Sequence, residues 1–256
     1  MMNDEQLLRY SRHLMLEGFD VAGQEKLLAA KVLVVGLGGL GCPVAMYLAA
    51  AGVGELLLAD DDHVDLGNLQ RQIAHTTQRI GRNKAESVRD TLLALNPDAR
   101  VQALPERLAG ERLLALVEAC DAVVDCTDNF TIRFALNRAA VASGVPLISA
   151  AAIRMEGQLS VFDVRGAGTP CYHCLYQEGD ELDTSCSQNG VLAPLVGVLG
   201  SLQALECIKV LSGTGTPLHG RLLLFDAAAL SFTTLQLARN PDCPVCAPLH
   251  ALARGA

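Results

Sequence analysis

The sequence predicts an α/β fold, because short apolar runs typical of buried strands alternate with helical patterns along the first half of the chain. A glycine-rich turn separates the first of these runs from the helix that follows it. The last third of the chain looks irregular and antiparallel. We therefore expect a Rossmann-like, mostly parallel sheet with helices on both faces, followed by antiparallel strands.

The elements are expected in the following order. The first strand, residues 31–35, is a β-branched run that ends in glycines, and the helix at 42–51 carries Pro43 in its first turn, where proline is tolerated. Further strands are expected at 55–59, 100–104, 121–125, 145–149, 158–164, 221–225 and 232–237. Further helices are expected at 84–95, 106–119, 130–143 and 195–211. The polar stretch 177–190 is expected to be a mobile loop.

Composition excludes several classes of protein. Half of the 256 residues are hydrophobic, which excludes a disordered chain, and the net charge of −8 argues against a nucleic-acid coat or a membrane-surface binder. The apolar stretch 191–211 contains Gln203, Glu206 and Lys209, so we expect a buried core helix rather than a membrane span. Residues 1–10 lack the apolar centre of a signal peptide, and we expect a cytoplasmic protein with no nucleic-acid or membrane partner.

A nucleotide-binding motif lies at the first strand. Gly36, Gly38 and Gly41 form the pattern G-x-G-x-x-G between a predicted strand and a predicted helix, which is the context that this motif requires. Such glycines let the backbone approach phosphate at the amino end of a helix. Asp60, at the tip of the next strand, is placed to bond ribose hydroxyls. The alternative is a tight turn without a ligand, and the motif alone leaves NAD and ATP open.

The polar residues after Asp60 favour a triphosphate. Asn68, Arg71 and Lys84 follow it, and arginine grips two phosphate oxygens at once. Asp128 follows another strand on the same edge of the sheet, where an aspartate beside phosphates is a natural magnesium ligand. The alternatives are solvated surface charges for the basic residues and a helix cap for Asp128. The histidines outside the cysteine motifs show no spacing that indicates a base or a ligand.

The nine cysteines sort into groups. Two C-x-x-C pairs, far apart in sequence, predict a structural Zn²⁺ site with four thiolate ligands, namely Cys171, Cys174, Cys243 and Cys246. A disulfide framework is the alternative, and a reducing compartment disfavours it. His173, inside the first pair, is a possible alternative ligand. The cysteines in apolar contexts are expected to be core residues: Cys42, Cys120, Cys126 and Cys207.

Taken together, the motifs resemble a family. The sequences VGLGGLG at 35–41, NLQRQ at 68–72 and DCTDN at 125–129, with Asp60 and Lys84 between them, are similar to the activating enzymes of ubiquitin-like sulfur carriers, the MoeB and ThiF group. The resemblance spans nearly the whole chain and is nearest to the molybdopterin branch. Further matching segments are RYSR at 9–12, AAIRMEG at 151–157 and APLVG at 193–197.

The resemblance implies ATP-dependent adenylation of a carrier protein. The C-terminal Gly-Gly carboxylate of the carrier would attack the α-phosphorus of ATP, giving an acyl-adenylate and pyrophosphate. Asp128 would organise Mg²⁺, and Arg12 would reach the phosphates of the partner subunit in a homodimer. The residues implied to hold ATP are Gly36, Gly38, Gly39, Gly41, Asp60, Gly67, Asn68, Leu69, Gln70, Arg71, Lys84, Asp128 and Asn129.

The resemblance also implies an organisation and leaves some choices open. We expect one adenylating domain over residues 1–256, with a nucleotide-binding part at 1–165 and a zinc-stapled, carrier-docking part at 166–256. Cys186, in the polar loop, is a candidate covalent acceptor, and a separate protein is expected to donate sulfur. Asn83 stands where the family pattern has proline, which concerns loop stiffness. The alternatives are the thiazole-pathway carrier as substrate, an NAD-dependent oxidoreductase, and a non-catalytic carrier-binding module.

Overall fold

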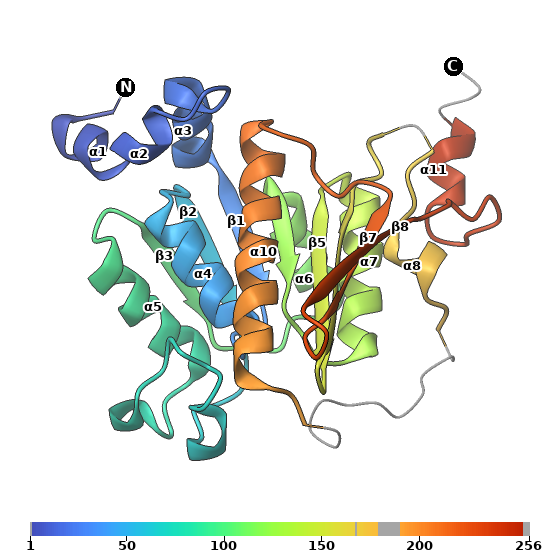
Figure 1. Ribbon diagram of the computed structural model, residues 1–256. Helices are drawn as coiled ribbons and strands as arrows, with labels where there is room; N and C mark the ends of the chain where they lie inside the picture. The colour runs from blue at the N-terminus through green and yellow to red at the C-terminus, as the bar shows by residue number, and fades with distance from the viewer. Residues whose placement is uncertain (1, 167, 179–189, 253–256) are drawn as a thin grey trace.

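The computed structural model describes residues 2–166, 168–178 and 190–252, which contain one eight-stranded sheet (Figure 1). The strands are β1 (Lys31–Val35), β2 (Glu55–Ala59), β3 (Arg100–Leu104), β4 (Ala122–Asp125), β5 (Leu147–Ile153), β6 (Glu156–Phe162), β7 (Arg221–Asp226) and β8 (Ser231–Gln236). Their order across the sheet is β3-β2-β1-β4-β5-β6-β7-β8. The pairs from β3 to β5 are parallel and those from β5 to β8 are antiparallel, so the expected fold class is confirmed.

Helices cover both faces of the sheet. The helices are α1 (Asp4–Arg9), α2 (Ser11–Leu14), α3 (Asp20–Ala29), α4 (Gly41–Ala50), α5 (Lys84–Leu95), α6 (Gly110–Glu118), α7 (Phe130–Ser143), α8 (Tyr172–Leu175), α10 (Ala193–Ser212) and α11 (Ala247–Leu252). Two short 3₁₀ turns, η1 (Leu66–Asn68) and η2 (Thr77–Arg79), lie between β2 and α5. Figure 1 shows α4, α5 and α10 in front of the sheet and α6 and α7 behind it.

Alternation along the strands divides the core between these two layers. Val32 and Val34 of β1 pack with residues of α4, α5 and α10, whereas Leu33 and Val35 pack with residues of α6 and α7. Successive side chains of a strand point to opposite faces, and a strand buried on both faces is therefore continuously apolar. This burial explains why the parallel strands were readable from their sequences.

The apolar stretch near residue 200 forms a core helix, as expected. Helix α10 is long and apolar enough to cross a membrane by length and composition, but half of its apolar window is buried inside the protein. The side chain of Gln203 donates to the carbonyl of Asp125 at 2.8 Å, and Glu206 accepts from the backbone N–H of Leu218 at 2.7 Å. These buried polar groups are satisfied within the protein, which a lipid-facing helix would not allow.

Several element boundaries differ from those expected, each for a local reason. Helix α6 begins at Gly110 rather than at 106, because Ala109 is extended and Leu108 turns into the core. Strand β6 begins at Glu156, two residues earlier than expected, because a tight turn at Arg154, where φ is 53°, joins it directly to β5. The sequence analysis did not identify α1, α2 and α3, because these helices have few buried residues and so show no clear apolar pattern.

Candidate functional site

A cleft opens at the carboxyl ends of the parallel strands. The strand order reverses between β1 and β4, and an open α/β sheet binds its ligands at such a point. The cleft has a volume of about 770 Å³, within the usual range for a cofactor site. Residues that follow β1, β2 and β4 line it, together with residues of β5 and β6.

The glycine loop after β1 forms the floor of the cleft. Gly36 has a φ of 87°, and a Cβ atom there would lie 2.8 Å from the carbonyl oxygen of Cys126. A Cβ at Gly41 would lie 1.9 Å from the carbonyl oxygen of Gly36. Gly38 and Gly39 line the cleft, whereas Gly41 begins α4 behind it. The loop therefore needs glycine for its own close packing as well as for access to a ligand.

Asp60 holds this loop from the end of β2. Its carboxylate accepts the backbone N–H of Leu37 at 2.6 Å and that of Asp62 at 2.9 Å. Burial raises the pKa of Asp60, and these two donors oppose the effect. The carboxylate also lines the cleft, where it is placed to accept hydrogen bonds from ribose hydroxyls.

Two cationic side chains reach the cleft from the segment after Asp60. The side chain of Lys84, at the first position of α5, is only 7% exposed, and its Nζ lies 2.6 Å from Oδ2 of Asp62. This hydrogen bond lowers the pKa of Asp62 against the opposing effect of its partial burial. Arg71 is half-buried and donates weakly, at 3.3 Å, to the carbonyl of Gly67 and to the side chain of Asn68. Both cations thus have partners that a polyphosphate can replace.

The turn after β4 separates two aspartates with different roles. Asp125 is buried and accepts from the N–H and hydroxyl of Thr127 and from the hydroxyl of Ser149. Asp128 is exposed in the cleft, and within the described part of the chain its carboxylate has no hydrogen bond or ion pair. The cap of α7 is Asn129, whose side chain accepts from the N–H of Ile132, so Asp128 does not serve as the cap. A free carboxylate oxygen in a phosphate-sized cleft fits a magnesium ligand.

The other predicted residues lie outside the cleft. Gly67, Leu69 and Gln70 belong to the turn that carries Asn68 but do not line the cavity. Arg12 is exposed on α2, beside the amino end of β1 and thus at the opposite end of the sheet. Cys186 lies outside the described residues, as does most of the stretch 177–190.

The sequence analysis missed several residues that line the cleft: Asp62, Gln72, Leu108, Phe130 and Arg133. Asp62 pairs with Lys84, and Leu108 and Phe130 come a few residues after strand ends. Proximity to a strand end was the available signal, because the carboxyl ends of parallel strands meet at one edge of the sheet.

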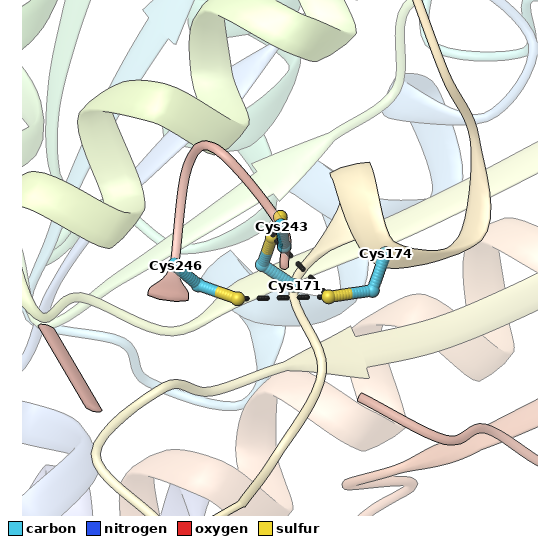
Figure 2. A group of neighbouring side chains, drawn as sticks. All are labelled: Cys171, Cys174, Cys243 and Cys246. Carbon is cyan, nitrogen blue, oxygen red and sulfur yellow. Dashed lines mark hydrogen bonds between the residues drawn. The ribbon is translucent and has the colours of Figure 1, made fainter. Parts of the chain in front are cut away.

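The two C-x-x-C pairs come together at α8 and the segment before α11, and none of the four cysteines lines the cleft (Figure 2). The four sulfur atoms all lie within 4.8 Å of one another, with 3.7 Å between Cys171 and Cys243 and 3.5 Å between Cys174 and Cys246. Four ligands at the usual Zn–S distance of about 2.3 Å would stand about 3.8 Å apart at the corners of a tetrahedron. The spacing therefore fits a tetrahedral four-thiolate metal site and excludes a formed disulfide, whose sulfurs are bonded at about 2.0 Å.

The surroundings of the cluster also favour a bound cation. The hydrogen bond with the neighbouring Cys174 raises the pKa of Cys171, and burial adds to the effect. Burial, with a smaller contribution from the hydrogen bond with Cys174, raises the pKa of Cys246 to about 12. The hydrogen bond with Cys171 lowers the pKa of Cys174 to about 4, and a thiolate is the form of cysteine that binds a metal. The side-chain amide of Asn137 donates to Sγ of Cys171 at 3.7 Å, as an outer-shell partner does. Nδ1 of His173 lies 3.9 Å from Sγ of Cys243, beside a sulfur set that is already complete.

The four cysteines expected in the core are buried there. Burial raises the pKa of Cys42, Cys120 and Cys207 to about 12 and that of Cys126 well above its ordinary value. Thiols of this kind are inert at neutral pH. Among the described cysteines, none is exposed, and only Cys174 of the metal cluster is half-buried.

Comparison with known proteins gives a consistent result. The model of the ThiF family matches residues 10–245. The chain is 48% identical to the molybdopterin-synthase adenylyltransferase of Escherichia coli K12, over 96% of this chain and 98% of that protein. It is also 48% identical to the sulfur carrier protein ThiS adenylyltransferase of the same organism, over 98% of this chain and 99% of that protein. Among solved structures, E. coli MccB with MccA-N7isoASN superposes with a TM-score of 0.82 at 26% identity, covering 95% of this chain and 75% of that one.

Proposed function

The chain belongs to the ThiF family, and we propose that it is an adenylyltransferase that activates a ubiquitin-like sulfur carrier at its C-terminal glycine. The observation that carries the proposal is the convergence of Lys84, Arg71 and Asp128 on a glycine loop in one cleft. In an NAD-dependent enzyme that transfers hydride, Lys84 and Arg71 would have no evident role. The carrier most favoured is the small subunit of molybdopterin synthase.

In this proposal, the cleft residues bind and orient ATP. The glycine loop at Gly36–Gly39 and the amino end of α4 face the phosphates, and Asp60 accepts the ribose hydroxyls. Lys84 leaves Asp62 and Arg71 leaves Asn68 to contact phosphate oxygens. The carrier carboxylate attacks the α-phosphorus, the bond to the bridging oxygen breaks, and pyrophosphate leaves. Positioning and charge neutralisation supply the rate enhancement.

Magnesium fits the carboxylate of Asp128, which lines the cleft. When bound, the ion would neutralise charge on the phosphates and stabilise the leaving pyrophosphate. Asp125 does not take this place, because it is buried outside the cleft lining and its oxygens accept three hydrogen bonds inside the protein. The buried ion pair of Asp125 with Arg133, 3.9 Å apart, instead supports the turn that presents Asp128.

The other half of the cleft suits an extended peptide tail. It is lined by residues of β5 and β6 and by Val191, and Gly157 contributes no side chain to this wall. A C-terminal Gly-Gly segment has no side chains to clash with such a wall. The carrier of the thiazole pathway is the second candidate, favoured by the equal identity to the ThiS adenylyltransferase.

The proposed active unit is a homodimer. Arg12 lies at the far end of the sheet from its own cleft, so only the cleft of a second copy is within its reach. The neighbouring helices α4 and α10 expose Tyr47, Val198 and Leu205, an apolar surface that a second copy would cover. In the proposal, this pairing brings Arg12 to the phosphates of the partner subunit.

The remaining parts of the proposal concern the cysteines. In the proposal, the four-cysteine cluster holds Zn²⁺ and joins the C-terminal tail, at Cys243 and Cys246, to the segment at Cys171 and Cys174, both within the part at 166–256, and this part and the nucleotide-binding part, 1–165, form one domain. The described cysteines are buried or belong to the cluster, which leaves Cys186 as the candidate for any covalent intermediate. In the proposal, a separate protein donates the sulfur. Free thiols and a thiolate metal site fit the reducing cytoplasm.

The test is ATP–pyrophosphate exchange with two purified carriers in parallel, one from the molybdopterin pathway and one from the thiazole pathway. Exchange that depends on the molybdopterin carrier is the expected result, and D128A is expected to abolish it. Exchange with the thiazole carrier alone would reassign the substrate. Absence of exchange with both carriers, together with normal carrier binding, would favour the non-catalytic module instead.

A further inference from the structure

Helix α5 brings Lys84 to the cleft, but the chain between β2 and α5 contains no strand or α-helix that would place it. Residues 60–83 form loops and two 3₁₀ turns. The backbone N–H of Lys84 donates to the carbonyl of Asp62 at 2.9 Å, and side-chain contacts add to this link between α5 and the cleft. Two side chains that the proposed chemistry does not use, those of Asn83 and His75, make such contacts.

Asn83 joins the amino end of α5 to the end of β2. Its side-chain oxygen accepts the N–H groups of Ala85 at 2.8 Å and Glu86 at 3.3 Å, which caps the helix. Its side-chain amide donates to the carbonyls of Asp60 at 2.9 Å and Asp62 at 3.1 Å. Because carbonyls only accept and N–H groups only donate, these four partners fix the orientation of the amide. One side chain thus ties the first turn of α5 to the two aspartates beside Lys84.

His75 joins the same helix to the glycine loop. Its Nδ1 lies 2.9 Å from the hydroxyl of Ser87 on α5, and its Nε2 lies 3.1 Å from the carbonyl of Leu37. The Leu37 carbonyl only accepts, so Nε2 carries the proton and Nδ1 accepts from Ser87. Since Asp60 accepts the N–H of Leu37, both backbone polar groups of this residue are bonded, and His75 is the partner of its carbonyl.

We propose that Asn83 and His75 are positioning residues that set the place of Lys84 relative to the glycine loop and Asp60, and so control the affinity for ATP. The inference rests on the proposed function, because it assigns Lys84 to the phosphates. Lysine carries a long, flexible stem, so its contribution to binding depends on how rigidly its own backbone is held. The two bridges hold that backbone from opposite sides, one toward β2 and one toward the loop.

The test is titration of the full-length chain with ATP and excess MgCl₂, using variants that separate bridging from folding. N83S keeps a helix-capping oxygen but is too short to reach the carbonyls of Asp60 and Asp62. H75N keeps a group near Nδ1 and loses the donor to Leu37, whereas H75Q places an amide N–H near Nε2. H75Q therefore keeps the contact with Leu37 but loses the one with Ser87. We expect N83S, H75N and H75Q each to bind ATP about tenfold more weakly than the wild type, because each variant keeps only one end of its bridge.

Two further measurements distinguish positioning from loss of structure. The melting temperature of N83S is expected to stay close to that of the wild type, and N3S, the same cap exchange on α1, is expected to bind ATP normally. In a K84A background, N83S and H75N are expected to cause no further loss, because they act through Lys84. Normal ATP affinity in N83S and H75N, or losses that add fully to that of K84A, would overturn the inference. A wild-type chain that does not bind ATP would overturn the proposed function and the inference with it.

Discussion

The glycine loop allows a quantitative prediction, because two glycines of the same motif face very different surroundings. A Cβ at Gly41 would lie 1.9 Å from the backbone oxygen of Gly36, about 1.5 Å inside an ordinary contact. Neither atom can rotate away, so G41A must displace the start of α4 or the loop itself. A Cβ at Gly38 would instead lie 3.3 Å from Nε2 of Gln72, the end of a side chain that can move.

The expected cost of G41A follows from this geometry. Overpacking against backbone costs about 3 kcal/mol or more, and the better helix propensity of alanine offsets up to about 1 kcal/mol. For a domain of this size, a net loss of about 2–3 kcal/mol lowers the melting temperature by roughly 5–10 °C. G38A is expected to melt within about 2 °C of the wild type, because Gly38 requires no positive φ.

The assay is thermal unfolding followed by circular dichroism, with ATP titration of the variants that remain folded. G41A is also expected to lose ATP binding, because its loop moves away from the phosphate position. A G41A protein that melts with the wild type and binds ATP normally would show that the close approach of Gly36 and Gly41 does not exist in solution. Equal destabilisation by G38A and G41A would refute the reasoning from local contacts.

Three other outcomes follow from the structure. C243S removes one of four sulfur ligands and is expected to reduce thermal stability. Elemental analysis of this variant should show a zinc content well below one ion per chain. Full zinc retention would contradict a four-thiolate site. Burial lowers the pKa of His75 from 6.5, so the unfolded chain binds the proton more readily than the folded chain. The stability that depends on neutral His75 is therefore full above pH about 6.5 and is lost as the pH falls below it. Urea unfolding at about pH 7.5 and 5.5 should show a smaller drop in the free energy of unfolding for H75Q than for the wild type. Equal drops in the two proteins would count against this assignment. If Arg12 acts across the dimer, mixing inactive R12A and D128A chains should restore up to about a quarter of the wild-type exchange per subunit, because each mixed dimer contains one intact site. No recovery of exchange would argue that Arg12 acts within its own chain.

Much of the fold was readable because local patterns match the final environment. The predicted ranges for β1, β2, β3, α5 and α7 agree with the structure residue for residue. Strands β1 and β2 are buried on both faces and are therefore almost continuously apolar, whereas the edge strand β3 alternates between apolar and polar residues. Helices α5 and α7 begin at asparagine caps, Asn83 and Asn129. The boundary errors fall where a turn overrides propensity, as at Arg154.

The candidate site was readable in part for a topological reason. Gly36, Asp60 and Asp128 each follow a parallel strand, so their meeting in one cleft follows from the sheet itself. The contacts of Asp62, His75 and Asn83 were not readable in this way. Sequence analysis gave His75 no partner and linked Asn83 only to loop stiffness, yet both bond to elements distant in the chain.

The amino-acid sequence by itself determined the α/β class, the order of most elements, the glycine loop and the two cysteine pairs. These features depend on periodicity, backbone freedom and ligand chemistry, which act over a few neighbouring residues. Only the tertiary structure decided that Asp125 accepts three hydrogen bonds while Asp128 has no hydrogen bond or ion pair to the described residues. It also decided that sulfurs 72 residues apart lie at the spacing of a tetrahedral site and that His75 bridges Ser87 and Leu37. Such pairings arise when packing brings distant residues together, so no local pattern specifies them.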